Sequence, residues 1–200
     1  MKTNTEADVR SDTAIRVMAI FFAAIMFLAF TTDPIRTGTN EGDRAPPLTG
    51  MAYNGSGWTN FDINDYFDTN WTAGDLDGQW LLVDFMDTDC PFCVRSAQEV
   101  GQNADYFMKL QGDWQGPIVN FVASATQLDI PGHETSRAEI EAFRDKSGEE
   151  SCAGNSCATR DGSSHGFVYI DDIDQDNMKA WKVPGTPSYF LIQTVGIVAW

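Results

Sequence analysis

The chain has 200 residues, a length typical of one domain or of one domain with an appendage. Its 42% of hydrophobic and 12% of aromatic residues can build a sizeable core, which excludes disorder along the whole chain. Its formal net charge of −16 repels phosphate backbones and therefore excludes nucleic acid as a partner.

An uncharged apolar segment follows the basic residues Lys2, Arg10 and Arg16. Residues 17–32 carry no charge, and residues 14–32 form a stretch of 19, close to the roughly 20 that a spanning helix needs. The sequence therefore predicts a short tail over 1–13 and a membrane anchor over 14–32. The alternatives are a cleaved signal segment and a buried helix of the domain. With an anchor or a signal, the basic residues stay inside and the remaining chain is extracytoplasmic.

The remaining chain alternates between strand and helix patterns. Residues 33–57 hold five glycines and three prolines, which predicts a linker, so we expect the folded domain over 58–200. Strand patterns occur at 80–86, 118–123, 167–170 and 188–192, and the last is expected to form a hairpin with 197–200 around Gly196. Helix patterns run from Cys90 toward Gly112, from Ser136 to about Lys146 and over 177–182, with loop over 147–166. This order predicts an α/β domain.

The clearest chemical signal is Cys90-Pro91-Phe92-Cys93, placed where a predicted strand ends and a helix begins. A C-x-x-C pair alone also occurs in zinc sites. A thiol at the first turn of a helix, however, faces unsatisfied N–H groups and the positive end of the helix dipole, which favour the thiolate. The second thiol lies one turn away and can resolve a mixed disulfide. We therefore expect Cys90 to attack, as the more exposed and more acidic thiol, and Cys93 to resolve.

Two further residues fit the same site. Asp84 interrupts an apolar strand, and a carboxyl buried there has a raised pKa and can exchange a proton with Cys93. The alternative is that Asp84 faces a polar seam. Pro187 stands directly before a predicted strand, where proline is tolerated. A cis bond between Thr186 and Pro187 would direct backbone groups toward an extended substrate.

The strand around Asp84, the CPFC motif six residues after it and the late Thr-Pro before a hairpin resemble the thioredoxin fold. Within that fold the chain is similar to the redoxin branch of TlpA and ResA, which are membrane-tethered thiol–disulfide oxidoreductases. Gly42–Pro46 resembles the redoxin opening G-x-x-A-P, and residues 121–170 resemble that branch's central insertion. The resemblance implies a central mixed sheet flanked by helices. It further implies site roles: Cys90 as nucleophile, Cys93 as resolving thiol, Asp84 as buried proton carrier, Pro187 as cis-proline, and Thr186, Pro91 and Phe92 as substrate contacts.

Three features depart from that family pattern. Asp87 and Asp89 precede the first cysteine in place of the usual aromatic residue, and two carboxylates oppose a thiolate. The Pro-Phe dipeptide resembles glutaredoxin and disulfide-oxidase sites, which leaves the redox direction open. The sequence stops inside its last predicted strand, so we expect the family's C-terminal helix to be missing from it.

The second cysteine pair, Cys152 and Cys157, lies in the predicted loop as C-x4-C. We expect a local structural disulfide, because an oxidising compartment favours it and the loop has little else to hold it. The alternatives are a second redox pair that relays electrons to Cys90 and Cys93, and a metal site made from both cysteine pairs or with His133 or His165. Outside such a site the two histidines are expected to be solvated.

Together these features predict an enzyme that exchanges disulfides with proteins outside the membrane, without a cofactor or a metal. Its partners would be protein thiols and disulfides, with a membrane or extracytoplasmic redox partner. A thiol peroxidase is the alternative among enzymes, although Asp87 stands where peroxiredoxins carry threonine. A metal carrier with the redoxin fold is the alternative from another class, although its C-x-x-x-C spacing is one residue longer.

Overall fold

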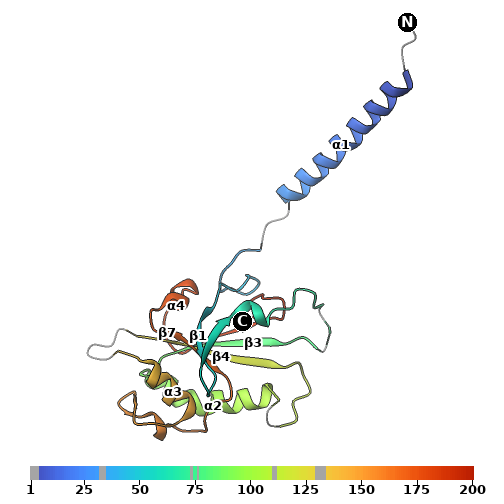
Figure 1. Cartoon of the computed structure of the whole chain (residues 1–200). Coiled ribbons are helices and arrows are strands. Elements are labelled where there is room, and N and C mark those ends of the chain that lie inside the picture. Colours follow the sequence, from blue (N-terminus) through green and yellow to red (C-terminus); the bar gives the residue numbers. More distant parts are fainter. Residues whose placement is uncertain (1–4, 32–34, 73, 76, 110–111, 129–133) are drawn as a thin grey trace. The chain divides into compact units, whose positions relative to one another are not determined.

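The computed structural model describes residues 5–31, 35–72, 74–75, 77–109, 112–128 and 134–200 (Figure 1). The chain divides into two compact units, Met1–Ile35 and Arg36–Trp200. The first unit contains one long helix, α1 (Thr5–Thr31). The second unit contains the sheet and the other described helices.

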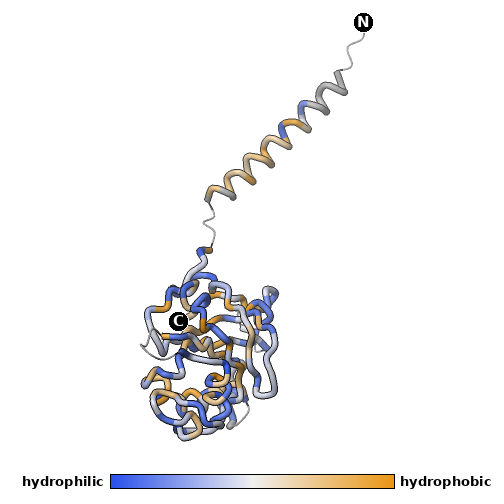
Figure 2. Tube along the Cα trace, turned by 60° about the vertical axis from the view of Figure 1, so that its left-hand side comes forward, coloured by the Kyte–Doolittle hydropathy of each residue, from blue (hydrophilic) through white to orange (hydrophobic). Residues whose placement is uncertain are grey.

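Helix α1 exposes its large apolar side chains, and Figure 2 colours much of this helix as hydrophobic. They are Ile15, Val17, Met18, Ile20, Phe21, Phe22, Ile25, Met26, Phe27, Leu28 and Phe30. Among the residues that the structure describes, no helix combines the length and the mean hydropathy required to cross a membrane. The predicted anchor, 14–32, ends at Thr32, which lies outside the described residues.

The second unit is built on a mixed sheet of six strands in the order β2-β1-β7-β4-β3-β8. The parallel centre consists of β3 (Trp80–Met86), β4 (Val119–Thr126) and β7 (Val168–Asp172). The antiparallel strands are β1 (Thr49–Tyr53), β2 (Trp58–Asp62) and β8 (Ser188–Ile192). A separate small hairpin joins β5 (Ser151–Cys152) to β6 (Asn155–Ser156).

Helices cover both faces of this sheet, with α2 (Pro91–Phe107) and α3 (Arg137–Asp145) on one face and α4 (Asp176–Ala180) on the other (Figure 1). Two 3-10 turns, η1 (Ile63–Tyr66) and η2 (Cys157–Thr159), complete the elements. Because side chains alternate along a strand, β3 supplies both cores. Val83 and Phe85 pack with the α4 side, whereas Met86 packs with the α2 side. Asp84 falls between Val83 and Phe85 and therefore faces α2.

Most predicted elements form where expected, with shifted ends. The strand over 80–86 is confirmed, and Ser136 caps α3 by accepting a hydrogen bond from the Glu139 N–H at 3.2 Å. Helix α2 ends at Phe107 instead of running toward Gly112, because Lys109 takes a left-handed conformation with φ 59°. The C-terminal hairpin turns at Gly196, and its second arm bonds to Leu191 without forming a regular strand.

The linker predicted over 33–57 is wrong for residues 36–57. Strand β1 lies inside it and pairs with both β2 and β7, and Leu48 is fully buried. Within the same segment, the motif Gly42–Pro46 packs along the C-terminal arm, and the Ala45 N–H donates to the Gly196 carbonyl at 3.0 Å. The strand was missed because glycine and small residues weaken its apolar pattern, and its stability comes from partners far along the chain.

Candidate active site

Cys90 occupies the N-cap of α2, directly after the three-residue loop over 87–89 that leaves β3. Cys90 and Cys93 are both free thiols and both are only 3% exposed. The expectation that Cys90 is the more exposed thiol is therefore wrong. The reason is the neighbouring loop, because the Cys90 Sγ lies against Thr186 and donates to its carbonyl oxygen at 3.3 Å.

The Cys93 thiol lies one helical turn further on and is held in its protonated form. Burial is the main cause that raises the pKa of Cys93, and the nearby Cys90 thiol and Asp84 carboxyl raise it further. Only a hydrogen bond with the Asp87 backbone lowers it. A resolving thiol in this state needs a base to accept its proton before it can attack.

Asp84 is a buried carboxyl that acts on Cys93 and could serve as this base. It is 6% exposed, and its Oδ1 has no hydrogen-bond partner among the described residues. Burial raises the pKa of Asp84 from 3.8 to about 7. The polar seam considered for Asp84 is not present around that oxygen, so the carboxyl is poised to take or return a proton near neutral pH.

Two tyrosines share the sheet row of Asp84. Tyr189 on β8 pairs directly with Asp84, and Tyr169 on β7 pairs with Ala123, which itself pairs with Asp84. Directly aligned residues of neighbouring strands point to the same face, so both rings lie on the α2 side. The Tyr189 hydroxyl donates to Ser96 Oγ at 3.4 Å, and Ser96 Oγ donates to the Cys93 carbonyl at 3.2 Å. The sequence did not single out either tyrosine.

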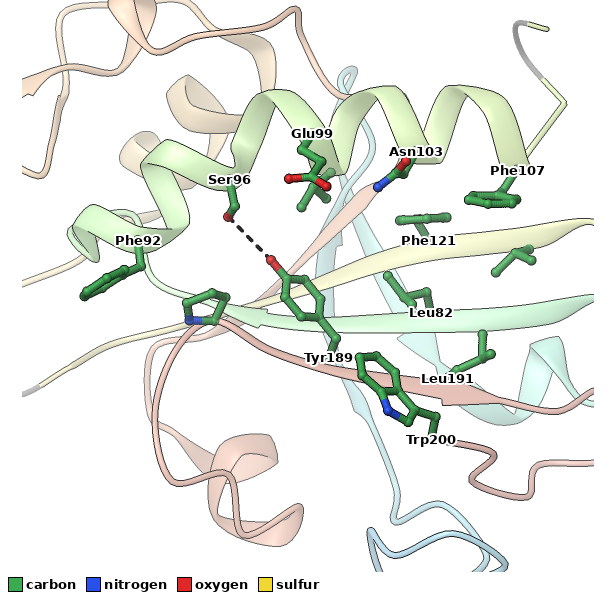
Figure 3. Close-up of a pocket in the computed structure, with 13 residues that line it drawn as sticks. Leu82, Phe92, Ser96, Glu99, Asn103, Phe107, Phe121, Tyr189, Leu191 and Trp200 are labelled. Carbon is green, nitrogen blue, oxygen red and sulfur yellow. Dashed lines mark hydrogen bonds between the residues drawn. The ribbon is translucent and has the colours of Figure 1, made fainter.

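The Thr186–Pro187 peptide bond is cis, and this loop faces Cys90 through the Thr186 carbonyl. The Thr186 Oγ1 is buried without a hydrogen-bond partner among the described residues. Pro187 and Phe92 both line an apolar groove, and Figure 3 shows Phe92 at one end of it. Phe92 is 63% exposed, and Arg95 lies 4.6 Å over its ring. The structure thus brings Cys90, Cys93, Asp84, Thr186, Pro187, Pro91 and Phe92 into one region.

The three residues before Cys90 connect the site to the segment between β4 and β7. Asp87 accepts a hydrogen bond from the Leu128 N–H at 2.6 Å. Thr88 donates to Glu139 at 2.6 Å, and Asp89 accepts from the Ala153 N–H at 2.9 Å. The aspartates that the sequence suggested as opponents of the thiolate therefore bind backbone amides. Their partners lie 41 to 64 residues away, so no local pattern could identify them.

Cys152 and Cys157 form a disulfide across the β5–β6 hairpin, as expected. Both are buried in the same core cluster as Cys90 and Cys93. Because Ala153 in this hairpin donates to Asp89, the disulfide hairpin also supports the loop that carries Cys90. Among the described residues, no group of three or more His, Cys, Asp or Glu side chains is arranged to hold a metal ion.

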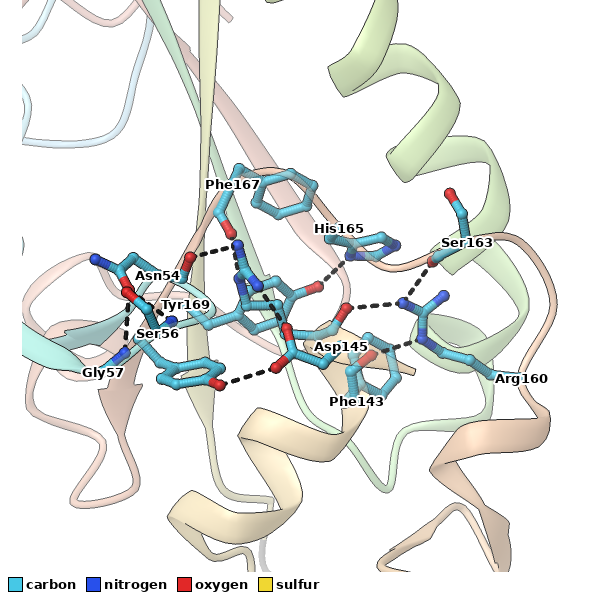
Figure 4. A network of polar contacts seen from close by, with 12 residues as sticks. Asn54, Ser56, Gly57, Phe143, Asp145, Arg160, Ser163, His165, Phe167 and Tyr169 are labelled. Atoms are coloured by element: carbon cyan, nitrogen blue, oxygen red, sulfur yellow. Dashed lines mark hydrogen bonds and ion pairs between the residues drawn. The ribbon is translucent and has the colours of Figure 1, made fainter. Parts of the chain in front are cut away.

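His165 is buried instead of solvated, which corrects the sequence expectation. Its Nε2 lies 2.9 Å from the Ala97 carbonyl. Its Nδ1 lies 2.6 Å from the Tyr169 hydroxyl (Figure 4). A carbonyl only accepts, so Nε2 carries the proton and Nδ1 accepts from Tyr169. Burial lowers the pKa of His165 to about 3, which keeps the ring neutral. His133 lies outside the described residues.

Figure 4 shows that this histidine belongs to a larger network of polar contacts. Arg144 donates to the Phe167 carbonyl and to the Asn54 carbonyl, each at 2.8 Å. Arg160 donates to the Phe143 carbonyl at 2.7 Å. The network ties α3, the β1–β2 turn and β7 together, and His165 extends it to α2, which holds the two thiols.

Comparisons with known proteins identify the fold. The 2-Cys peroxiredoxin of Plasmodium vivax, in its reduced form, is 15% identical with a TM-score of 0.54 over 80% of this chain and 69% of its own. An uncharacterized conserved protein of Geobacillus kaustophilus is 17% identical with a TM-score of 0.56 over 81% and 68%. A hypothetical protein of Sinorhizobium meliloti is 19% identical with a TM-score of 0.55 over 82% and 70%.

No family model and no curated protein matches the sequence. At such low identity the structural matches establish the fold alone, which is the thioredoxin-like α/β fold that the motifs predicted.

Proposed function

We propose that this chain is a thiol–disulfide oxidoreductase that uses Cys90 and Cys93. The observation that carries the proposal is the position of the Cys90 sulfur. It lies at the N-terminus of α2 and against the Thr186 carbonyl, with the Cys93 thiol one turn behind it. A buried Asp84 carboxyl on the same face supplies a group that titrates near neutral pH. This combination suits a nucleophile, a resolving thiol and a base.

In the reducing direction the Cys90 thiolate attacks one sulfur of a substrate disulfide. A bond forms between Cys90 and that sulfur, and the other substrate sulfur leaves as a thiolate. Asp84 takes the proton of Cys93, whose thiolate then attacks the Cys90 sulfur and releases the second substrate thiolate. Two electrons pass from the Cys90–Cys93 dithiol to the substrate, and the pair is left as a disulfide. The oxidising direction is the reverse of these steps.

Redox titration of the full chain tests this proposal. In glutathione buffers of graded potential, the Cys90–Cys93 pair should convert reversibly between dithiol and disulfide, counted by thiol labelling. A midpoint near about −270 mV would indicate a reductant, and one near about −120 mV an oxidant. The Cys152→Ser, Cys157→Ser double variant is the control and should give the same midpoint if that disulfide is structural. A Cys90–Cys93 pair that forms no reversible disulfide would contradict the proposal.

We also propose that α1 holds the domain at the extracytoplasmic side of a membrane. Support comes from the exposed apolar side chains of α1 and from the basic residues before them. Such a location would give the domain access to protein thiols and disulfides and to a redox partner of the membrane. Cleavage as a signal segment remains the competing hypothesis.

Membrane extraction separates these two locations. The full chain should stay with the membrane after an alkaline wash, because its apolar helix is not held by charge. Replacing Phe21, Phe22 and Ile25 with Asn should release most of it. Ile35→Asn is the matched control, since Ile35 is exposed but lies outside the apolar run. A mature chain that begins after about residue 31 would instead establish a cleaved signal.

A further inference from the structure

Two acceptor motifs for N-linked glycans occur in the second unit. Asn54-Gly55-Ser56 and Asn70-Trp71-Thr72 each place a hydroxyl residue two positions after an asparagine, with a residue other than proline between them. Both asparagines are exposed. Such motifs accept glycans on chains that leave the cytoplasm, which is the location proposed for this domain. The surroundings of the two motifs differ, and this difference distinguishes them as acceptors.

The first motif forms the turn between β1 and β2. The Asn54 Oδ1 accepts hydrogen bonds from the Ser56 N–H at 2.9 Å and from the Ser56 hydroxyl at 2.8 Å. It also accepts from the Gly57 N–H at 3.2 Å. Gly55 takes a positive φ of 96°, which glycine adopts readily, so the turn holds the asparagine against the hydroxyl. The acceptor amide and the hydroxyl of the motif are therefore in direct contact.

The amide nitrogen of Asn54 is directed outward. Its Nδ2 donates to no other residue that the structure describes, and Figure 4 shows it pointing away from the polar network. The Asn54 backbone carbonyl accepts from Arg144 at 2.8 Å, which ties the turn to α3. The turn thus presents an unpaired amide nitrogen to solvent on an anchored backbone.

The second motif lacks this contact. The Thr72 hydroxyl donates to the Asp75 carboxylate at 2.5 Å, and the Thr72 N–H donates to the same carboxylate at 3.3 Å. The Trp71 indole donates to the Asp75 carbonyl at 3.1 Å. The hydroxyl residue is therefore held by Asp75 and not by Asn70, so Asn54 is the better acceptor.

The Asn54 turn lies away from the candidate active site. Strands β3, β4 and β7 run in parallel toward the edge where Cys90 follows β3, and β1 runs in the opposite direction. Tyr53 is aligned with Tyr169, which lies in the sheet row of Asp84. Asn54 follows Tyr53 and is therefore on the side of this row that is remote from Cys90. A bulky group on Asn54 leaves the two thiols accessible.

We propose that Asn54 carries an N-linked glycan. The inference rests on the extracytoplasmic location proposed above and adds to it a covalent modification. A bond forms between the Asn54 Nδ2 and the anomeric carbon of a sugar, and the bond from that carbon to the phosphate of a lipid-linked glycosyl phosphate donor breaks. The phosphate leaves with the electron pair of that bond. The amide nitrogen loses one proton to a base of the transferring enzyme.

Peptide mapping of the full chain, purified from the membranes of its own cells, tests the proposal. Proteolysis after aromatic residues separates Asn54, which lies between Tyr53 and Trp58, from Asn70. Mass spectrometry should find a glycan on the Asn54 peptide in most molecules and on the Asn70 peptide in few.

Four variants assign the acceptor. Asn54→Gln and Ser56→Ala should both lose the glycan, and Ser56→Ala does so with the asparagine still present. Ser56→Thr restores a hydroxyl and should restore the glycan. Asn70→Gln is the matched control and should leave the modification of Asn54 unchanged. Because these positions are exposed and remote from Cys90, all four variants should keep the rate of disulfide exchange, which verifies their folding.

Protease treatment of intact cells separates this proposal from the one it rests on. An unmodified Asn54 on a domain that external protease digests would overturn the glycan and leave the location supported. An unmodified Asn54 on a protected domain would overturn both. A glycan on Asn70 alone, or a glycan on Asn54 that persists in Ser56→Ala, would also overturn the assignment. A glycosylated chain whose Cys90–Cys93 pair forms no reversible disulfide would contradict the proposed oxidoreductase and leave the glycan supported.

Discussion

Replacing Cys93 with Ser should turn the full chain into a trap for its substrates. Cys90 would still attack a substrate disulfide, but serine cannot displace the bound sulfur, so the mixed disulfide persists. Covalent adducts should accumulate and remain intact on non-reducing gels. Turnover should fall to the background rate. Replacing Cys90 with Ser should also abolish turnover, without any adduct, because the remaining thiol is buried and protonated.

The pair of variants assigns the two roles. Since Cys90 and Cys93 are equally buried, the assignment rests on helix position and on contact with Thr186 and not on exposure. Adduct formation by the Cys90→Ser variant, with none by Cys93→Ser, would reverse the roles. Turnover that persists in Cys90→Ser would place the chemistry elsewhere.

Replacing Asp84 with Asn should slow exchange and stabilise the fold at the same time. The amide has a similar volume but cannot accept the Cys93 proton, so the resolving step should slow on the order of 100-fold. In the unmodified chain the rate should rise as pH passes about 7, where Asp84 ionises. This inflection should disappear in the Asp84→Asn variant. Stopped-flow measurement of the exchange rate of both proteins between pH 5 and 9 tests this.

The stability effect of this substitution follows from the raised pKa. The folded chain keeps the Asp84 proton up to about pH 7, whereas the unfolded chain releases it near the ordinary value of 3.8. The free energy of unfolding therefore falls as pH rises between these values and is flat above them. The loss is on the order of 4 kcal/mol. Asp84→Asn should match the unmodified chain near pH 4 and exceed its stability by up to that amount at pH 8.

A second buried aspartate provides the control for rate. Asp172 lies on β7, and its carboxylate accepts hydrogen bonds from the Asn177 and Met178 N–H groups of α4. Burial raises the pKa of Asp172 to about 6, yet it contacts neither thiol. Asp172→Asn should leave the rate of exchange unchanged. An unchanged pH–rate profile in Asp84→Asn would reduce Asp84 to a packing residue.

Local patterns predicted much of this protein. The apolar strand over 80–86, the cap at Ser136 and the CPFC motif at a helix start depend on neighbouring residues, so the sequence alone could place them. Asp84 could be assigned to the buried side of its strand because an apolar run leaves no exposed face for it. The disulfide between Cys152 and Cys157 closes a short loop, and it was expected because that loop has little else to hold it.

Other features depend on how distant segments meet in the sheet. Strand β1 is held in the sheet by pairing with β2 and with the distant β7, and a short strand with glycine gives no such signal by itself. The low exposure of Cys90 follows from its contact with Thr186, 96 residues away. The order β4-β3-β8 places Tyr189 beside Asp84. Other elements likewise supply the amides that bind Asp87 and Asp89. They also supply the Ala97 carbonyl that contacts the buried His165. Sequence patterns encode local backbone preferences and burial, whereas strand order, register and loop packing decide which side chains share one site.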